Sequence, residues 1–273
     1  MSIRKAYVDL PEGQLHYRYI AGSEGLPVVF LHQTASSGRM WEKVMVQLTG
    51  AHPLYAFDTP GFGGSFDPPG APGMVEYARW MLEAIDALGL ERVHLVGHHT
   101  GAAIAIELAA RAPDRIATLA MIGPNPLTVE ERATFAGKLG AAFRPGRSGA
   151  YLLKNWEYLR TGGADADIAL LHAEMVDMLR AWAARPHAYA AVWGQDFAAL
   201  YACIACPMLI MAAPDDILFA FFERARRLRP DAAALVLERG ANFEPDLAPG
   251  AVAEAIRQHI AQPLRIFAST SER

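Results

Sequence analysis

Residues 93–101 read V-H-L-V-G-H-H-T-G, and this stretch decides the fold of the 273-residue chain. The mainly apolar segment Val93–Val96 runs into Gly97, and a series of small residues follows Gly101. This pattern predicts a buried strand, a sharp turn and a helix, which is the layout of the nucleophile elbow, G-x-S-x-G. Such an elbow presents one side chain at the top of a sheet. In this chain the nucleophile position holds His99 instead of Ser, Cys or Asp.

Segments on both sides of the elbow carry further motifs. Phe57–Ser65 reads F-D-T-P-G-F-G-G-S and contains a D-x-x-G-x-G-x-S turn. Val28–His32 is an apolar strand that enters a loop, and Pro207–Asp216 is another strand followed by two acidic residues. With the elbow, these segments resemble the α/β-hydrolase fold superfamily over nearly the whole chain. The resemblance implies an α/β fold with a mostly parallel, doubly wound, eight-stranded sheet and a helical cap. It also implies that Asp58, in the D-x-x-G-x-G-x-S turn, has a structural role.

The resemblance also locates the three positions of a catalytic triad, and two of them are altered. The elbow holds His99, and the position of the usual catalytic histidine, within Gly240–Phe243, holds Asn242. Only the acid, Asp216, is of the usual type. We expect these three residues to form the catalytic centre, with Asn242 or a water linking His99 to Asp216. The neighbouring His98 is expected to pack beside the elbow in a structural role.

Four further residues are predicted to bind substrate. The backbone N–H groups of Thr34 and Thr100 lie where this fold holds an oxyanion. Gln33 replaces the glycine usual in the oxyanion loop, so its amide either contacts substrate or bonds within the protein. Asn125 follows the sixth expected core strand and is predicted to be a polar contact in the pocket. We expect no metal and no cofactor at this site.

The hydrophobic pattern supports the same fold. Ala6–Leu10 and Leu15–Tyr19 alternate around a Glu-Gly turn, which predicts an antiparallel hairpin. Six continuous apolar runs follow, as expected of parallel strands that are covered on both faces. These runs are Val28–Leu31, Leu54–Phe57, Val93–Val96, Leu119–Ile122, Met208–Met211 and Ala234–Leu237. The helical segments that alternate with them are Met74–Leu88, Ala102–Arg111, Phe219–Leu228 and Gly250–Ile260. This alternation predicts right-handed crossovers with helices on both sides of the sheet.

One long segment breaks the alternation. Residues 125–202 contain no convincing buried strand and have helical periodicity with many aromatic residues. We therefore expect a core of residues 1–124 and 203–273, with a helical cap of residues 125–202. The aromatic residues of this segment are Phe135, Phe143, Tyr151, Trp156, Tyr158, Trp182, Tyr189, Trp193, Phe197 and Tyr201. Most would form the core of the cap, and some would line a pocket for a small hydrophobic, even aromatic, molecule.

Composition limits the classes of partner. The chain is 52% apolar, which is enough to bury a large core, and its formal net charge is only −4. Without a basic cluster, nucleic acid is not an expected partner. No apolar run reaches the length of a membrane span, and Met1–Leu10 lacks the hydrophobic core of a signal peptide. We expect a cytoplasmic protein with no membrane partner, and a homodimer stays open.

Cys203 and Cys206 form a C-x-x-C motif, which is also found in redox proteins. Here the motif precedes a strand and does not open a helix that would acidify a thiol. We therefore expect the two cysteines to be small apolar residues that pack beneath the sheet.

Two functions fit these residues. The first is an enzyme whose acid/base centre is His99, acting on a small hydrophobic carbonyl compound as a hydrolase, a lyase or a cofactor-independent oxygenase. Imidazole chemistry operates at neutral pH, which supports this hypothesis. The second is an inactive protein in which His99 plugs the old site and the pocket binds a small hydrophobic ligand. Ordinary serine esterase activity is disfavoured, because the elbow has no serine or cysteine.

Overall fold

A computed structural model describes residues 2–22, 24–136 and 144–261 of the chain. Its strands form one sheet with the order β1-β2-β4-β3-β5-β6-β7-β8. They are β1 (Arg4–Leu10), β2 (Gly13–Ile20), β3 (Val28–Leu31), β4 (Leu54–Phe57), β5 (Val93–His98), β6 (Ile116–Ile122), β7 (Met208–Ala212) and β8 (Ala233–Val236). Strand β1 pairs with β2 and β2 with β4 in antiparallel fashion, and the other pairs are parallel. This confirms the predicted eight-stranded, mostly parallel sheet.

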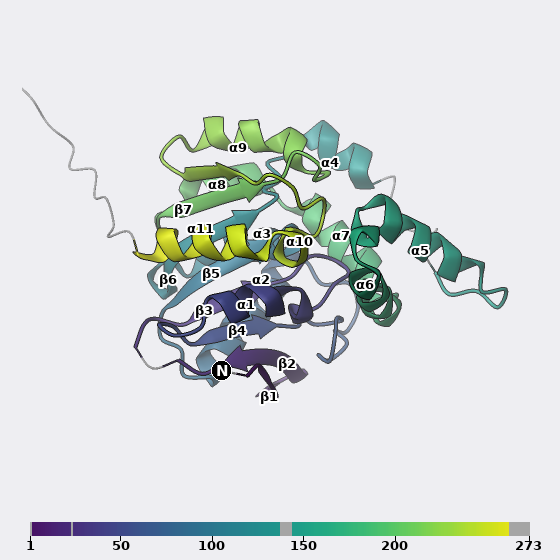
Figure 1. The fold of residues 1–273 in the computed structure, drawn as a ribbon, viewed down its shortest axis with the longest axis horizontal. Coiled ribbons are helices and arrows are strands. Elements are labelled where there is room, and N and C mark those ends of the chain that lie inside the picture. The colour runs from purple at the N-terminus through teal and green to yellow at the C-terminus, as the bar shows by residue number, and fades with distance from the viewer. Residues whose placement is uncertain (1, 23, 137–143, 262–273) are drawn as a thin grey trace, which may run out of the picture.

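Helices cover both faces of this sheet (Figure 1). The α-helices are α1 (Glu42–Gln47), α2 (Met74–Ala87), α3 (Thr100–Arg111), α4 (Val129–Ala136), α5 (Ala150–Thr161), α6 (Ile168–Arg180), α7 (Ala184–Gly194), α8 (Phe197–Cys203), α9 (Phe222–Leu228), α10 (Glu244–Leu247) and α11 (Pro249–Ala261). Short 3₁₀ helices are η1 (Gly38–Trp41), η2 (Pro113–Arg115), η3 (Ala164–Ala166) and η4 (Phe219–Phe221). Among these helices, none is both long and apolar enough to span a membrane.

The alternation of side chains along each central strand produces two hydrophobic cores. In β3, Val29 and Leu31 join the core under α2 and α3, whereas Val28 and Phe30 join the core under α1 and α11. Figure 1 shows α1 and α11 on the near side of the sheet. Burial on both faces explains why the central strands are continuous apolar runs in the sequence.

The last strand departs from this pattern. All four residues of β8 are exposed, although the sequence predicted a strand covered on both faces. Strand β8 is at the edge of the sheet and pairs only with β7. A short apolar run does not distinguish an edge strand from a central one, and this is why the prediction of burial was wrong.

Helices α4–α8 all lie between β6 and β7 in the chain, where the cap was predicted. In Figure 1, α5, α6 and α7 gather beyond one end of the sheet. Of the predicted aromatic residues, Tyr201 and Phe197 are buried, Trp182 is exposed, and Phe143 lies outside the described residues. The division into core and cap by residue number stays a prediction.

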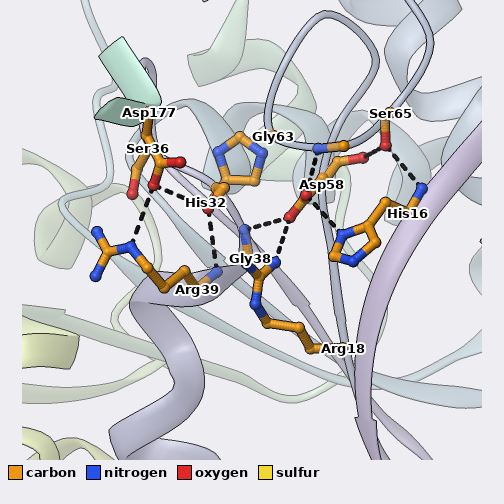
Figure 2. A network of polar contacts seen from close by, with 12 residues as sticks. His16, Arg18, His32, Ser36, Gly38, Arg39, Asp58, Gly63, Ser65 and Asp177 are labelled. Atoms are coloured by element: carbon orange, nitrogen blue, oxygen red, sulfur yellow. Dashed lines mark hydrogen bonds and ion pairs between the residues drawn. The ribbon is translucent and has the colours of Figure 1, made fainter. Parts of the chain in front are cut away.

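Helix α6 is tied to the loop that follows β3. Ser36 Oγ and Arg39 Nη2 both donate to Glu174, at 2.9 and 2.5 Å. Ser37 Oγ donates to Asp177 at 2.9 Å. Arg39 Nε donates to the same carboxylate at 3.3 Å (Figure 2). Glu174 is buried, so these bonds form largely out of water and fix α6 against the loop.

The two cysteines differ in their surroundings. Cys203, at the end of α8, is exposed, which contradicts the predicted packing of this residue beneath the sheet. Cys206 packs partly buried against the core, and burial raises the pKa of its thiol to about 11. A thiol with that pKa is protonated at neutral pH and is a poor nucleophile.

Asp58, which follows β4, organises the loops at the carboxyl end of the strands (Figure 2). Its carboxylate accepts hydrogen bonds from His16 Nδ1 at 2.7 Å and Arg18 Nη1 at 2.9 Å. It also accepts from the backbone N–H groups of Gly38 and Gly64, both at 2.8 Å. The four donors come from β2, η1 and the turn after Asp58, which explains the structural role expected of this motif.

Replacing Asp58 with asparagine is expected to destabilise the fold by about 2–3 kcal/mol at pH 7. Burial opposes ionisation, but His16, Arg18 and Gly64 lower the pKa of Asp58 from 3.8 to about 2. The stabilisation is therefore full above pH 3.8 and is lost as the pH falls toward 2. Urea unfolding of both proteins between pH 2 and 7 measures this. Equal losses of stability in the two proteins across pH 3.8–2 would contradict the prediction.

Candidate active site

The elbow is formed by the turn between β5 and α3. His99 occupies it with φ 48° and ψ −106°, a left-handed conformation that is rare outside glycine. The two flanking glycines allow the tight crossing. A Cβ on Gly97 would lie 2.4 Å from the carbonyl oxygen of Gly101, and one on Gly101 would lie 2.2 Å from that of Leu31. The sequence pattern G-x-x-x-G thus has the steric origin expected of an elbow.

His99 contacts the predicted acid directly. Its Nε2 lies 2.9 Å from Asp216 Oδ2, and Asp216 Oδ1 accepts a hydrogen bond from the backbone N–H of Leu218 at 2.7 Å. Burial opposes the ionisation of Asp216, but the charge of His99 and these hydrogen bonds hold its pKa below the usual value. The expectation that Asn242 or a water links His99 to Asp216 was wrong, because the imidazole reaches the carboxylate directly.

Space for this pair comes from Gly123, which follows β6 with φ +63°. A Cβ on Gly123 would lie 2.3 Å from His99 Cδ2, 2.5 Å from His99 Nε2 and 3.0 Å from Asp216 Oδ2. Any side chain at position 123 would therefore displace the imidazole from the acid.

His98 lies under the elbow, as the sequence predicted. Its ring is fully buried and stacks on the His99 ring, with centroids 4.2 Å apart and an interplanar angle of 13°. Its Nε2 lies 2.9 Å from Oε2 of Glu244, a residue that the sequence analysis did not single out. Burial, the main cause, and the nearby charges of His99 and His32 keep the pKa of His98 well below its usual value, so its ring is neutral.

Ligand atoms of His98, His99 and Glu244 lie within 4.8 Å of one another, which is close enough to consider a metal ion. The stacked rings argue against it. The lone pair of an imidazole nitrogen lies in the plane of its ring, so two nearly parallel rings cannot direct their lone pairs at one ion. The arrangement fits a hydrogen-bonded cluster better than a metal centre.

A small cavity of about 90 Å³ opens above His99. Its lining combines residues of the core loops with residues of helices α4, α5 and α7. These are Gln33, Thr34, His99, Thr100, Asn125, Phe135, Tyr158, Tyr189, Val192, Trp193, Ile217, Leu218 and Asn242. The structure thus brings every predicted site residue to this cavity except Asp216, which lies behind His99.

The two amide side chains of the site have structural partners. Gln33 Nε2 donates to the backbone carbonyl of Asn242 at 2.7 Å, and Asn242 Oδ1 accepts from the backbone N–H of Ile217 at 3.1 Å. These bonds connect the oxyanion loop, the loop after β8 and the acid loop. The second of the two roles considered for Gln33, bonding within the protein, is the one seen.

Two other predicted residues present polar atoms without partners. Thr34 Oγ1 and Asn125 Oδ1 are buried and have no hydrogen-bond partner among the described residues. Because buried polar groups are normally satisfied, these atoms at the cavity are suited to bind the polar part of a ligand.

The cavity wall includes a stack of aromatic rings. The sequence analysis assigned these residues to the cap but did not say which of them line the cavity. The ring centroids of Tyr189 and Trp193 lie 5.8 Å apart with an interplanar angle of 2°. Those of Phe135 and Trp193 lie 5.1 Å apart with an interplanar angle of 25°. Tyr189 and Trp193 are four residues apart in α7, so helical spacing could have predicted that they share a face. The contact with Phe135 of α4 depends on the packing of two helices.

Comparisons with known proteins agree with this fold. A family model described as alpha/beta hydrolase fold matches residues 27–146. A protein of Klebsiella pneumoniae named as a carbamate hydrolase, RutD, is 30% identical over 208 residues, which cover 71% of this chain and 75% of that protein. A haloalkane dehalogenase of Agrobacterium fabrum is 30% identical over 158 residues, or 57% of this chain. That match spans 52% of the dehalogenase, so the chain covers about half the length of this relative.

Solved structures extend the likeness of the fold to nearly the whole chain. The structure of E-2-(acetamidomethylene)succinate hydrolase has a TM-score of 0.77 at 21% identity and covers 96% of this chain and 100% of its own. The enol-lactonase of Burkholderia xenovorans has a TM-score of 0.72 at 19% identity, covering 94% of this chain and 100% of its own. By its eight-stranded sheet, its elbow and the relative named as a carbamate hydrolase, the chain belongs to the α/β-hydrolase superfamily.

Proposed function

We propose that this protein is an enzyme that acts on a small hydrophobic carbonyl compound through acid/base chemistry centred on His99. The observation that carries the proposal is the direct contact of 2.9 Å between His99 Nε2 and the buried Asp216 carboxylate. An imidazole held by an ionised acid can take up and return a proton. A histidine that only filled the old site would not require a buried acid beside it.

The same contact supports an assignment of the reacting nitrogen. Because Asp216 accepts from Nε2–H, the lone pair of neutral His99 resides on Nδ1. In the Ser-His-Asp triad the acid faces Nδ1 and the reacting nitrogen is Nε2, so the two nitrogens exchange roles here. We infer that Nδ1 takes a proton from a water or from an acidic group of the substrate. The N–H groups of Thr34 and Thr100 would stabilise the oxyanion that develops.

The cavity favours a compact and flat substrate. Its volume of about 90 Å³ limits the size of the occupant, and the rings of Tyr189 and Trp193 offer an apolar wall. Aromatic rings bind other flat rings by offset stacking, which favours an aromatic or conjugated substrate. The unpaired oxygen atoms of Thr34 and Asn125 would meet its polar groups.

Among the reaction types that suit such a site, hydrolysis has the most support. Relatives named as a carbamate hydrolase and as a dehalogenase both bear names of hydrolytic enzymes. In this reaction His99 would take a proton from water, the hydroxide would attack the carbonyl carbon, and His99⁺ would return the proton to the leaving group. A lyase or an oxygenase reaction would use the same base on a proton of the substrate.

A substrate panel tests the proposal. Small aryl esters, aryl carbamates, enol lactones and conjugated ketones would be incubated with the parent protein and with His99→Ala, and products identified by mass spectrometry. We expect turnover of at least one class by the parent and its loss in the variant. Turnover that persists in His99→Ala would refute the assignment of His99. A ligand that binds the cavity and is recovered unchanged would favour the binding protein instead.

Serine-directed fluorophosphonate probes are expected to leave the protein unlabelled. The elbow offers an imidazole and no hydroxyl, and Thr100 is the first residue of α3. Intact-mass and peptide analysis after labelling measures this, with a serine esterase of the same fold as the positive control. Stoichiometric labelling at Thr100 would contradict the prediction and point to a hydroxyl nucleophile.

A further inference from the structure

Glu244 is buried beneath the His99–Asp216 pair. It is the first residue of α10, two positions after Asn242, and its exposed fraction is 0%. Gly240 makes room for it, since a Cβ there would lie 2.2 Å from Glu244 Cγ. A carboxyl group enclosed in this way must be satisfied by hydrogen bonds, because burying it unpaired would cost several kcal/mol.

Three groups supply these hydrogen bonds. Glu244 Oε2 lies 2.9 Å from His98 Nε2, and Oε1 accepts from the backbone N–H of Ala213 at 3.4 Å. The Glu244 and Asp216 side chains are also neighbours, and a hydrogen bond between them is one cause of the shifted pKa of each carboxyl group. Two carboxyl groups can share a hydrogen bond only when one of them carries the proton. Glu244 therefore touches both the acid of the pair and the ring on which His99 is stacked.

The position of that proton follows from the surroundings. Burial, followed by the negative charge of Asp216, raises the pKa of Glu244 well above its usual value, whereas the pKa of Asp216 is lowered. The proton therefore resides on Glu244 and the charge on Asp216. Such a division of one proton between two neighbouring carboxyl groups gives them different roles.

The neutral ring of His98 completes the arrangement. A neutral imidazole carries one N–H proton, and we assign that of His98 to Nε2, which donates to Glu244. Nδ1 is buried and has no hydrogen-bond partner among the described residues, which fits an unprotonated nitrogen. His32, whose Nε2 accepts from the backbone N–H of Thr59 at 3.0 Å, is held neutral by burial, which lowers its pKa. The titratable groups that contact His99 or its direct partners are Asp216, His98 and Glu244, and the phenols of Tyr158 and Tyr189 line the same cavity.

We propose that Glu244 is a positioning residue, whose protonated carboxyl group donates to Asp216 and accepts from His98 and so holds the His99 imidazole in place. Glu244 acts through Asp216 and His98 and lies outside the cavity lining. The inference rests on the proposed role of His99 as the acid/base centre.

Imidazole NMR titration tests this without any substrate. In Glu244→Gln, whose amide can donate and accept in the same places, we expect the midpoint of His99 to stay within about 0.2 pH units of the parent. In Glu244→Leu we expect it to rise by roughly 0.5–1 unit, because Asp216 loses a donor and its full charge then acts on His99⁺. Asp246→Asn, on the same short helix but paired with Lys43, is the control and should leave the midpoint unchanged.

Two outcomes would overturn the proposal. One is a His99 midpoint that is the same in the parent and in a folded Glu244→Leu, which would make Glu244 merely a packing residue. The other concerns the parent alone, in case the leucine variant does not fold. We expect its infrared spectrum at pH 7 to contain the carbonyl band of a protonated carboxylic acid that disappears in Glu244→Gln, and absence of this band would refute the protonated state. Neither readout depends on turnover, so a failure here is distinguishable from a failure of the proposed function.

Discussion

Replacing His99 with alanine is expected to lower kcat on the cognate substrate by a factor of at least about 100, the usual scale for a general acid–base group. The imidazole carries the proton between substrate and solvent, and no other described side chain of the cavity lining is paired with Asp216. Steady-state kinetics of the parent and the variant, with a Tm for each, measures the effect on a folded protein.

Substrate affinity should change much less than kcat in His99→Ala. The aromatic wall and the unpaired oxygens of Thr34 and Asn125 remain in place and supply most of the binding. Asp216→Asn is expected to lower kcat in the same direction but by less, since Asp216 orients and charges the imidazole without touching substrate. The opposite pattern, no turnover in the parent and a large loss of affinity in His99→Ala, would identify the protein as a ligand-binding module.

Gly123→Ala is expected to reduce kcat about as strongly as the loss of His99 itself. A Cβ at this position would lie 2.3 Å from His99 Cδ2 and 2.5 Å from Nε2, well inside contact distance, so the imidazole must leave Asp216. Displacing a catalytic group by about 1 Å commonly costs two orders of magnitude in rate. The same kinetic assay, with imidazole NMR to follow His99, measures the displacement and its effect.

The matched control for this variant is Gly89→Ala. Gly89 lies two residues beyond the end of α2 with φ +69°, close to the +63° of Gly123, but a Cβ there would meet nothing within 4 Å. Both substitutions place a side chain in the left-handed region and should cost about 1 kcal/mol of stability for that reason. Only Gly123→Ala should change kcat and the His99 resonances. Equal activity of the two variants would show that the crowding at His99 is relieved by movement elsewhere.

The sequence was sufficient for the sheet and the elbow because their signals are local. Strands β3 and β4 coincide with the apolar runs Val28–Leu31 and Leu54–Phe57, and the glycines of the elbow have spacing that a steric argument explains. The position of Asp216 in the loop after β7 followed from the same alignment with the family's motifs. Strand periodicity and turn chemistry are properties of neighbouring residues, so they can be recognised in the sequence alone.

The parts that sequence analysis missed depend on contacts between distant segments. Glu244 and His98 are 146 positions apart, and a glutamate beside a proline is typical of an exposed first turn of a helix. Side-chain lengths left open whether His99 reaches Asp216 directly, because that distance depends on the absence of a Cβ at Gly123. Both the Glu244–His98 contact and the His99–Asp216 contact depend on how distant segments pack together, which the hydrophobic periodicity of a sequence does not indicate.

The left-handed backbone of His99 also affects what a substitution at this position does to the stability of the fold. A residue with a Cβ at φ 48° costs roughly 1–2 kcal/mol relative to glycine, so a change to glycine at position 99 would be stabilising. Selection for stability alone would favour that change in a protein that had no use for the imidazole. Histidine at position 99 therefore costs backbone stability, and we expect its benefit to lie in the chemistry of the imidazole.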